Sequence, residues 1–329
     1  MNKVERFRAM LRGESVDCVP AGFWFHFSPE FKGGEAMARK HLEYYRATDL
    51  DILKVMNDTG YAPIGTMVVR KPKDWAKLEP TPLSDAFYRS HLEGLQRIVE
   101  AVGREVPIMT TVFNPFHEAV GIIRASVPRG SPDEPQARQI LLAQLRANPE
   151  PVLGALQIIA EDQARFFRAC ITEAGIGGIY FSAQGGEADL MSDKEHARFL
   201  KPFDLYVLRE VGHVAEFIVG HFCGKEINLS RFVDYPVHLA NWAYQSGNLS
   251  LSAGKALLGG VSILGGLDER GPLVYGPREA LRAEVERALA EMGDRGFMLG
   301  AGCTVPGDID LSNLVYARSL LRAGTRSAG

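Results

Sequence analysis

The segment "EFIVGHFCGK", residues 216–225, decides the fold. A nearly continuous apolar run follows Glu216 and ends at His221, and Cys223 stands two residues further on. Runs of this kind are typical of strands that are buried on both faces of a parallel sheet, because a half-solvated strand would alternate apolar and polar residues. The segment therefore predicts a buried strand with His221 and Cys223 at its carboxyl end.

Similar short apolar runs recur along the whole chain, separated by amphipathic helical patterns that open on Ser, Asn or Gly-Pro and close at a Gly. Eight strands with intervening helices, and no Gly-x-Gly-x-x-Gly turn after the first, favour a (β/α)8 barrel over an open doubly wound sheet. We expect one α/β TIM-barrel domain over residues 1–329 with an N-terminal helical extension. The other expected strands are 21–27, 51–57, 106–113, 177–183, 236–242, 261–267 and 296–302, the helical patterns are 84–103, 148–175, 192–212 and 276–293, and 127–136 is expected to be a long loop.

The composition limits the classes of function. The 329 residues are 46% hydrophobic and 23% charged, which is enough for a large buried core. A net charge of −3 gives no electrostatic reason to expect nucleic acid or an anionic membrane as a partner. The chain has no apolar run long enough to span a bilayer, so we expect a cytoplasmic protein. Four scattered cysteines do not make a disulfide framework and leave thiols for metal binding.

The predicted barrel brings three potential metal ligands to one end. Active sites of such barrels lie at the carboxyl ends of the strands. His221 and Cys223 are at i and i+2, so they face the same way, and Cys303 follows the eighth strand. Imidazole and thiolate favour Zn²⁺, and three protein ligands with an open fourth position are typical of catalytic zinc. The alternative is three buried or hydrogen-bonded side chains with no metal.

Further polar residues are expected at the same end of the barrel. Gln184 and Glu187 follow the fourth strand, where each would serve as a hydrogen-bond partner, as a displaceable fourth ligand or as part of a solvated loop. His26 and Asn241 are expected at the ends of the first and sixth strands. Both are candidate substrate-binding residues, although strand register decides which way each points.

Two more residues complete the candidate substrate site. Trp24 is expected to form core or pocket wall, and Asp268, at the end of the seventh strand, would orient either the substrate or a loop. The aromatic segment 23–27 suggests a compact, partly apolar substrate. Four other histidines fall on helical patterns and are expected on the surface: His41, His91, His196 and His213.

Several motifs occur in an order that resembles the uroporphyrinogen decarboxylase superfamily. This resemblance implies a (β/α)8 barrel and a choice between two chemistries. The motifs extend from one end of the chain to the other: "VERFRAMLRGESVDCVP" (4–20), "DLDILKVMND" (49–58), "LMSDKEHARFLKPF" (190–203), "HFCG" (221–224), "LGGLDERGPLVYGPREAL" (264–281) and "GCTVPGDIDLSNL" (302–314).

The decarboxylases of this superfamily carry an arginine-rich segment after the first strand, which pairs with the carboxylates of a tetrapyrrole. Residues 23–31, "FWFHFSPEF", contain no arginine. Since Arg is the side chain suited to bidentate carboxylate recognition, haem-pathway decarboxylation is disfavoured. Asp58 does match the family's essential aspartate in its spacing from Asp51. This match implies a decarboxylase or lyase that acts on a smaller acid. The alternative is that Asp58 is a loop carboxylate that caps the following turn.

The other branch resembles methyl-cobamide:thiol methyltransferases, in which a His-x-Cys and a distant Cys hold zinc. His221, Cys223 and Cys303 match this pattern. The resemblance implies that a small thiol binds to Zn²⁺ as thiolate and accepts a methyl group. The donor would be a corrinoid on a separate protein, because no Asp-x-His-x-x-Gly signature is present. A non-catalytic zinc or corrinoid/thiol-binding protein is the third alternative, and the acceptor thiol, the methyl donor and a homodimer stay open.

Overall fold

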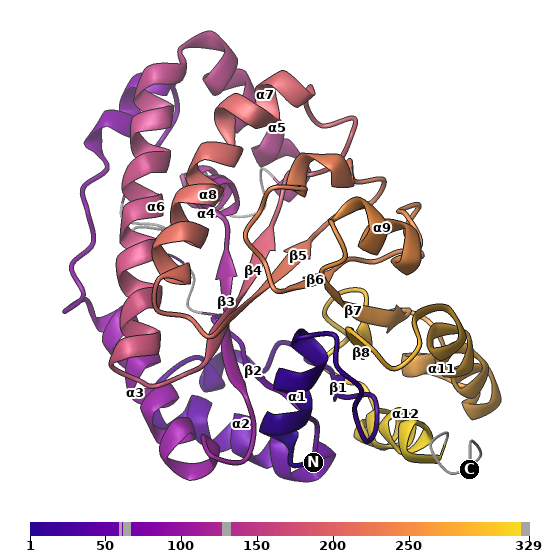
Figure 1. Ribbon diagram of the computed structural model, residues 1–329. Helices are drawn as coiled ribbons and strands as arrows, with labels where there is room; N and C mark the ends of the chain where they lie inside the picture. Colours follow the sequence, from indigo (N-terminus) through magenta and orange to yellow (C-terminus); the bar gives the residue numbers. More distant parts are fainter. Residues whose placement is uncertain (59–60, 62–66, 127–132, 324–329) are drawn as a thin grey trace.

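The computed structural model of the protein describes residues 1–58, 61, 67–126 and 133–323. Its eight strands form one parallel sheet in the order β1-β8-β7-β6-β5-β4-β3-β2, with helices on the outside (Figure 1). The predicted single-domain (β/α)8 barrel is confirmed. The strands are β1 (Ala21–Gly22), β2 (Leu53–Val55), β3 (Ile108–Phe113), β4 (Gly178–Ala183), β5 (Phe217–Phe222), β6 (Leu239–Asn241), β7 (Ser262–Leu267) and β8 (Phe297–Ala301).

Several helices begin where a short polar side chain caps the first turn. Asn2 and Ser192 each form a reciprocal capping box with a glutamate three residues on. The helices of the described residues are α1 (Lys3–Leu11), α2 (Gly34–Thr48), α3 (Ala86–Val102), α4 (Pro115–Ala125), α5 (Glu134–Ala147), α6 (Pro149–Thr172), α7 (Asp193–Phe199), α8 (Lys201–Gly212), α9 (Leu251–Leu257), α10 (Pro272–Tyr275), α11 (Arg278–Met292) and α12 (Leu311–Ala323).

A buried aspartate connects β1 and β2, which are not directly paired in the described part of the sheet. We call this junction the seam. The backbone N–H of Asp51 donates to the carbonyl of Ala21 at 2.9 Å, and the N–H of Ala21 donates to the Asp51 carboxylate at 3.0 Å. The same carboxylate accepts from Arg6 of α1 at 2.7 Å and from Arg318 of α12 at 3.3 Å. Helices α1 and α12 are thus both tied to the seam.

The core has two parts, one outside the barrel and one inside it. Phe7 of α1 packs edge-on against Phe217 with ring centroids 4.8 Å apart, so the predicted N-terminal helix plugs the amino-terminal end of the barrel. The opposite end of the barrel, where the strands reach their carboxyl ends, is not covered by this helix and holds the candidate site. The inner cluster consists of Phe7, Met10, Trp24, Ile52, Met56, Met109, Tyr180, Phe217, Val219, Leu239, Leu264 and Met298.

Three expectations about boundaries were wrong. The first strand stops at Gly22, so Phe23–Phe27 lie beyond the ladder. The helical pattern 192–212 forms two helices that break at Leu200, directly before Lys201 and Pro202. Helix α4 follows the third strand, where only a long loop was expected. The expected loop covered residues 127–136. Residues 127–132 of it lie outside the described residues, and residues 134–136 form the start of α5.

Three of the four helical histidines expected on the surface are buried, and only His213 is exposed. His41 accepts from the backbone N–H of Met56 at 3.1 Å and contacts the Met37 carbonyl at 2.8 Å, and His91 lies 2.8 Å from the Thr110 hydroxyl. His196 is also buried, against Phe232. Among the described segments, no helix has both the length and the apolar character that crossing a membrane requires.

Candidate metal centre

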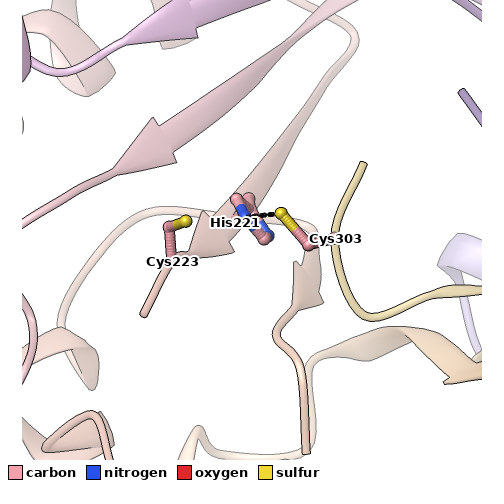
Figure 2. Close-up of side chains that lie close together, drawn as sticks. All are labelled: His221, Cys223 and Cys303. Atoms are coloured by element: carbon pink, nitrogen blue, oxygen red, sulfur yellow. Dashed lines mark hydrogen bonds between the residues drawn. The ribbon is translucent and has the colours of Figure 1, made fainter. Parts of the chain in front are cut away.

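The three predicted ligands come together at the carboxyl ends of β5 and β8. The candidate ligand atoms of His221, Cys223 and Cys303 all lie within 4.8 Å of one another, and Figure 2 shows the three side chains converging. Barrel closure makes this possible, because Cys303 approaches from three strands away along the sheet. His221 is buried and the two cysteines are half-buried.

The geometry of this group fits a tetrahedral zinc ion. Zinc–sulfur bonds of about 2.3 Å and zinc–nitrogen bonds of about 2.0–2.1 Å at a tetrahedral angle place the two donor atoms about 3.6 Å apart. The Cys303 sulfur lies 3.5 Å from Nε2 of His221. No other His, Cys, Asp or Glu of the described residues joins this group, so the residues present fit a zinc site with three protein ligands.

Asn241 orients the His221 imidazole from the neighbouring strand. The two residues are paired in the β5–β6 register, and Oδ1 of Asn241 lies 2.7 Å from Nδ1 of His221. The Asn241 amide is itself fixed, because its Nδ2 donates to the carbonyls of Leu264 and Ala301 at 2.8 and 3.1 Å. Tyr180 donates to the same Oδ1 at 2.8 Å. Both the oxygen and the nitrogen of the Asn241 amide are therefore already hydrogen-bonded within the protein. We infer that Asn241 positions His221 instead of contacting substrate.

The thiols of Cys223 and Cys303 lie close enough to shift each other's pKa in opposite directions. The contact with Cys223 lowers the pKa of the Cys303 thiol, and the charge of His221 adds to this effect, although burial opposes it. The same contact raises the pKa of Cys223, and burial adds to the rise. Gln184 also hydrogen-bonds Cys223. One sulfur is therefore predisposed to be a thiolate, which is the form that binds metal.

Glu187 lies beside the centre but outside the ligand group. Its Oε1 accepts from Arg138 of α5 at 2.7 Å, whereas Oε2 is buried and has no hydrogen-bond partner among the described atoms. Arg138 also donates to Glu134 and to Gln184, at 2.7 and 2.9 Å. Arg138 was not expected from the sequence, because a helical pattern does not reveal which helix reaches over the barrel mouth.

His26 and Asp58 form a pair at the same rim. Nδ1 of His26 lies 2.5 Å from the Asp58 carboxylate, and the His26 side chain is half exposed. His26 also lines a cavity of about 600 Å³ together with Phe25, Phe27 and Tyr44. A carboxylate that holds one imidazole nitrogen leaves the other free for proton transfer or for hydrogen bonding.

A lysine that was not expected at the site from the sequence lies inside the barrel. Lys54 of β2 is buried, and its Nζ stands 3.6 Å from the ring centroid of Tyr180 and 4.6 Å from that of Trp24. The two rings meet edge-on at 5.0 Å, so the Trp24 ring faces the interior as expected. Burial lowers the pKa of Lys54 to about 7, while the charges of Cys303, Asp58 and Cys223 oppose that shift.

Asp268 shapes the turn after β7. Its carboxylate accepts from the backbone N–H of Arg270 at 2.7 Å, and its own N–H donates to Glu284 at 2.9 Å. The next residue, Glu269, lies closer to the ligands. A side chain at Gly302 would approach Oε2 of Glu269 to 3.0 Å, and burial raises the pKa of Glu269. The geometry therefore favours the loop-orienting alternative for Asp268.

Comparison with protein-family models gives one match, described as uroporphyrinogen decarboxylase, over residues 52–322. The match covers most of the chain, including all three candidate ligands and Asp58. The chain belongs to the uroporphyrinogen decarboxylase family. The resemblance inferred from the ordered motifs is thereby confirmed. No curated protein matches the sequence.

Solved structures support the barrel over nearly the full chain. A methyltransferase from Methanosarcina mazei has a TM-score of 0.75 at 21% identity, with 99% of this chain and 100% of that chain covered. A B12-independent methionine synthase from Shewanella sp. W3-18-1, in complex with selenomethionine, has a TM-score of 0.56 at 10% identity, covering 94% and 97%. A putative B12-independent methionine synthase from Listeria monocytogenes has 0.54 at 10%, covering 87% and 85%. At these identities the likeness is one of fold.

Proposed function

We propose that the protein is a zinc-dependent methyltransferase that moves a methyl group from a corrinoid, or a similar donor, to a small thiol. The observation that carries the proposal is the convergence of the candidate ligand atoms of His221, Cys223 and Cys303 within 4.8 Å. A structural zinc site would need a fourth Cys or His, and the described residues supply none. When bound, zinc would hold the acceptor as a thiolate at neutral pH.

The chain's own residues have distinct tasks in this proposal. Asn241 keeps the proton of His221 on Nδ1, so that Nε2 presents its lone pair to the metal. Gln184 fixes Cys223, and Glu187 lies beside Cys223 as a hydrogen-bond partner or displaceable ligand. The acceptor sulfur would form a bond to the methyl carbon, and a corrinoid donor would keep the electron pair of its broken carbon–cobalt bond. The thiol proton is released to solvent.

The comparisons support the reaction class without assigning it. One of the structural relatives named above is described as a methyltransferase, and the other two are described as B12-independent methionine synthases. The methionine synthases are B12-independent, so the barrel alone does not specify a corrinoid donor. A separate corrinoid protein remains part of the proposal because this sequence lacks the corrinoid-binding signature.

A second candidate function is decarboxylation or a lyase reaction on a small acid. The 2.5 Å contact between Asp58 and His26 favours it, since a paired carboxylate and imidazole at a barrel rim suit acid–base chemistry. Segment 23–31 holds no arginine to bind a polycarboxylate, so this candidate is limited to small acids. A non-catalytic zinc or corrinoid/thiol-binding protein is the third alternative.

Metal analysis and two activity assays, one for thiol methylation and one for loss of a carboxylate from a small acid, separate the three. The purified protein is analysed for zinc, and methylcobalamin is then mixed with a small thiol while cobalamin absorbance reports loss of the methyl group. We expect one zinc per chain and thiol-dependent demethylation. Both should disappear when His221, Cys223 and Cys303 are replaced by Ala, whereas Asp58→Asn should keep the zinc.

The outcomes that contradict the proposal are specific. Absence of stoichiometric zinc, together with full activity of the triple variant, would refute a zinc mechanism. Zinc and thiol binding without any methyl transfer would favour the non-catalytic alternative. Activity on an acid that is lost in Asp58→Asn but kept in the triple variant would favour the decarboxylase or lyase.

A further inference from the structure

A further cavity lies at the amino-terminal end of the barrel, opposite the metal centre. Its volume is about 540 Å³, and it is enclosed by the end of α1, the residues just before β6, the chain from α9 to the start of β7, and the residues just before β8. None of the residues assigned to the proposed function lines it. Small-molecule sites have volumes of about 300–1,000 Å³, so this cavity is large enough to be one.

The side chains that line this cavity carry positive charge. Arg12, Lys255 and Arg295 are cations, and the imidazole of His238 is a fourth basic group. No Asp or Glu is among the described residues that line the cavity. Glu14 pairs with Arg12 at 2.7 Å, but both side chains are more than half exposed, so this pair contributes little and can be exchanged for a ligand. The cavity is therefore electrostatically suited to an anion.

Lys255 and Arg295 are held only loosely by the protein. Nζ of Lys255 contacts the carbonyls of Arg295 and Gly296 at 3.3 and 3.4 Å, and Nη1 of Arg295 donates to the Gly13 carbonyl at 3.4 Å. Hydrogen bonds from such groups to an anionic oxygen are shorter, about 2.7–2.9 Å. Burial lowers the pKa of Lys255, and no described carboxylate offsets that effect. Both cations thus have N–H groups left for a ligand.

Two further features prepare the floor of the cavity. The backbone N–H of Ile218 donates to Nδ1 of His238 at 3.0 Å, so the neutral imidazole carries its proton on Nε2 and can donate it to a ligand. Gly296 has a φ of +59°, and a Cβ there would stand 3.0 Å from Nζ of Lys255 and 3.3 Å from Oγ of Ser262. Glycine at this position therefore leaves space beside two polar atoms.

The cavity also has an apolar side, made by Leu11, Val237, Leu258 and Val261. An inorganic anion would engage the basic groups and leave this side unused. A ligand that matches both sides has an anionic group at one end and a compact apolar body at the other. Lysine and arginine together suit phosphate, which offers three acceptor oxygens and up to about two negative charges at neutral pH.

We propose that this cavity binds a small organic phosphate monoester, with the phosphate at Lys255 and Arg295 and the apolar body against Leu258 and Val261. The site adjoins the beginnings of β6, β7 and β8, whereas the candidate metal ligands lie at the carboxyl ends of β5 and β8. The inference therefore goes beyond the proposed function and does not depend on it.

The test measures binding to the purified full chain by isothermal titration calorimetry. The probes are phenyl phosphate, inorganic phosphate, which lacks the apolar body, and benzoate, which lacks the phosphate. We expect one phenyl phosphate per chain, bound about tenfold more tightly than either other probe, because it alone uses both sides of the cavity. Lys255→Met and Arg295→Met should each weaken its binding about ten- to a hundredfold, the range for hydrogen bonds to a charged group.

Arg8→Met is the matched control. Arg8 is also a cation of α1, but it pairs with Glu216 and does not line the cavity, so its loss should leave the affinity unchanged. A second measurement locates the ligand. Phenyl phosphate should slow the acetylation of Lys255 by acetic anhydride, followed by mass spectrometry, but not that of Lys201, which pairs with Asp234. If a cavity variant does not fold, this protection decides the inference.

Three results would overturn the proposal. Binding of phenyl phosphate that does not saturate, or that Arg8→Met weakens as much as the cavity variants do, would show only a general attraction of anions to the surface. Saturable binding that survives in both cavity variants and leaves Lys255 unprotected would place the phosphate elsewhere, such as at the metal centre. Equal affinities for phenyl phosphate and benzoate would refute the phosphate class.

Discussion

Nδ1 of His221 lies 2.7 Å from Oδ1 of Asn241, whose amide nitrogen is held by two backbone carbonyls of the barrel. The carbonyls can only accept, so they fix the amide with its oxygen towards the imidazole. That oxygen in turn requires a proton on Nδ1 of His221. The sheet register thereby determines which imidazole nitrogen is free for a metal.

We predict that Asn241→Ala weakens zinc binding. Without the acceptor, His221 loses both its fixed tautomer and its orientation, and removal of such a partner typically costs about 10- to 100-fold in metal affinity. Competition with a chromophoric chelator measures the change. Tyr180→Phe is the matched control, because it removes the other hydrogen bond to the same oxygen and should change affinity far less. Equal losses in both variants would contradict the tautomer argument.

Gly224→Ala should damage the centre through the backbone. Gly224 follows Cys223 with a φ of +134°, which L side chains rarely adopt, and an added Cβ would stand 2.9 Å from Glu187. We expect a loss of about 1–3 kcal/mol in unfolding free energy and weaker zinc binding. Gly259→Ala, with a φ of +74° and nothing within 4 Å, should lose stability alone. Unchanged zinc affinity in Gly224→Ala would refute the prediction.

Asp51→Asn should destabilise the barrel seam. Arg6 and Arg318 both form ion pairs with the buried Asp51 carboxylate. Neutralising Asp51 removes this negative charge from beside both guanidinium groups. Breaking a buried pair typically costs about 3–5 kcal/mol, measured here by urea unfolding. Glu14→Gln, in a surface pair with Arg12, should have little effect. Similar midpoints for the two variants would show that the seam does not depend on this charge.

The fold was predictable because its signal is local. Strands buried on both faces must be apolar throughout, and each of the eight runs became a strand. Their lengths were less predictable. The aromatic run after Gly22 has strand propensity, yet Phe23–Phe27 pack at the rim without ladder bonds. The buried histidines were missed because a helical pattern does not show which polar positions find a partner within the core.

The convergence of the three candidate ligands was predictable because His221 and Cys223 are neighbours in sequence and Cys303 follows another strand end. Lys54 was missed because it was read as part of an apolar run, although its alternation with Ile52 and Met56 is the signal that places it inside the barrel. Arg138 had no such signal. Its contact with Glu187 depends on how α5 crosses the barrel mouth, which only tertiary packing determines.

The buried carboxyl of Asp204 should make stability depend on pH. Burial raises its pKa to about 7, although hydrogen bonds from Tyr235 and Asn114 oppose the shift, and its Oδ1 has no partner among the described atoms. Between about pH 4 and pH 7 the folded chain holds a proton that the unfolded chain releases, so the free energy of unfolding falls as pH rises through this window. The side chain of Asp204→Asn cannot titrate, so the variant should show a smaller decline. We expect the drop in unfolding free energy between about pH 5 and about pH 7.5, measured by urea unfolding, to be roughly 1–4 kcal/mol smaller than in the wild type. The exposed Asp193→Asn is the control and should keep the wild-type slope. A wild-type slope in Asp204→Asn would mean that other groups carry the pH dependence.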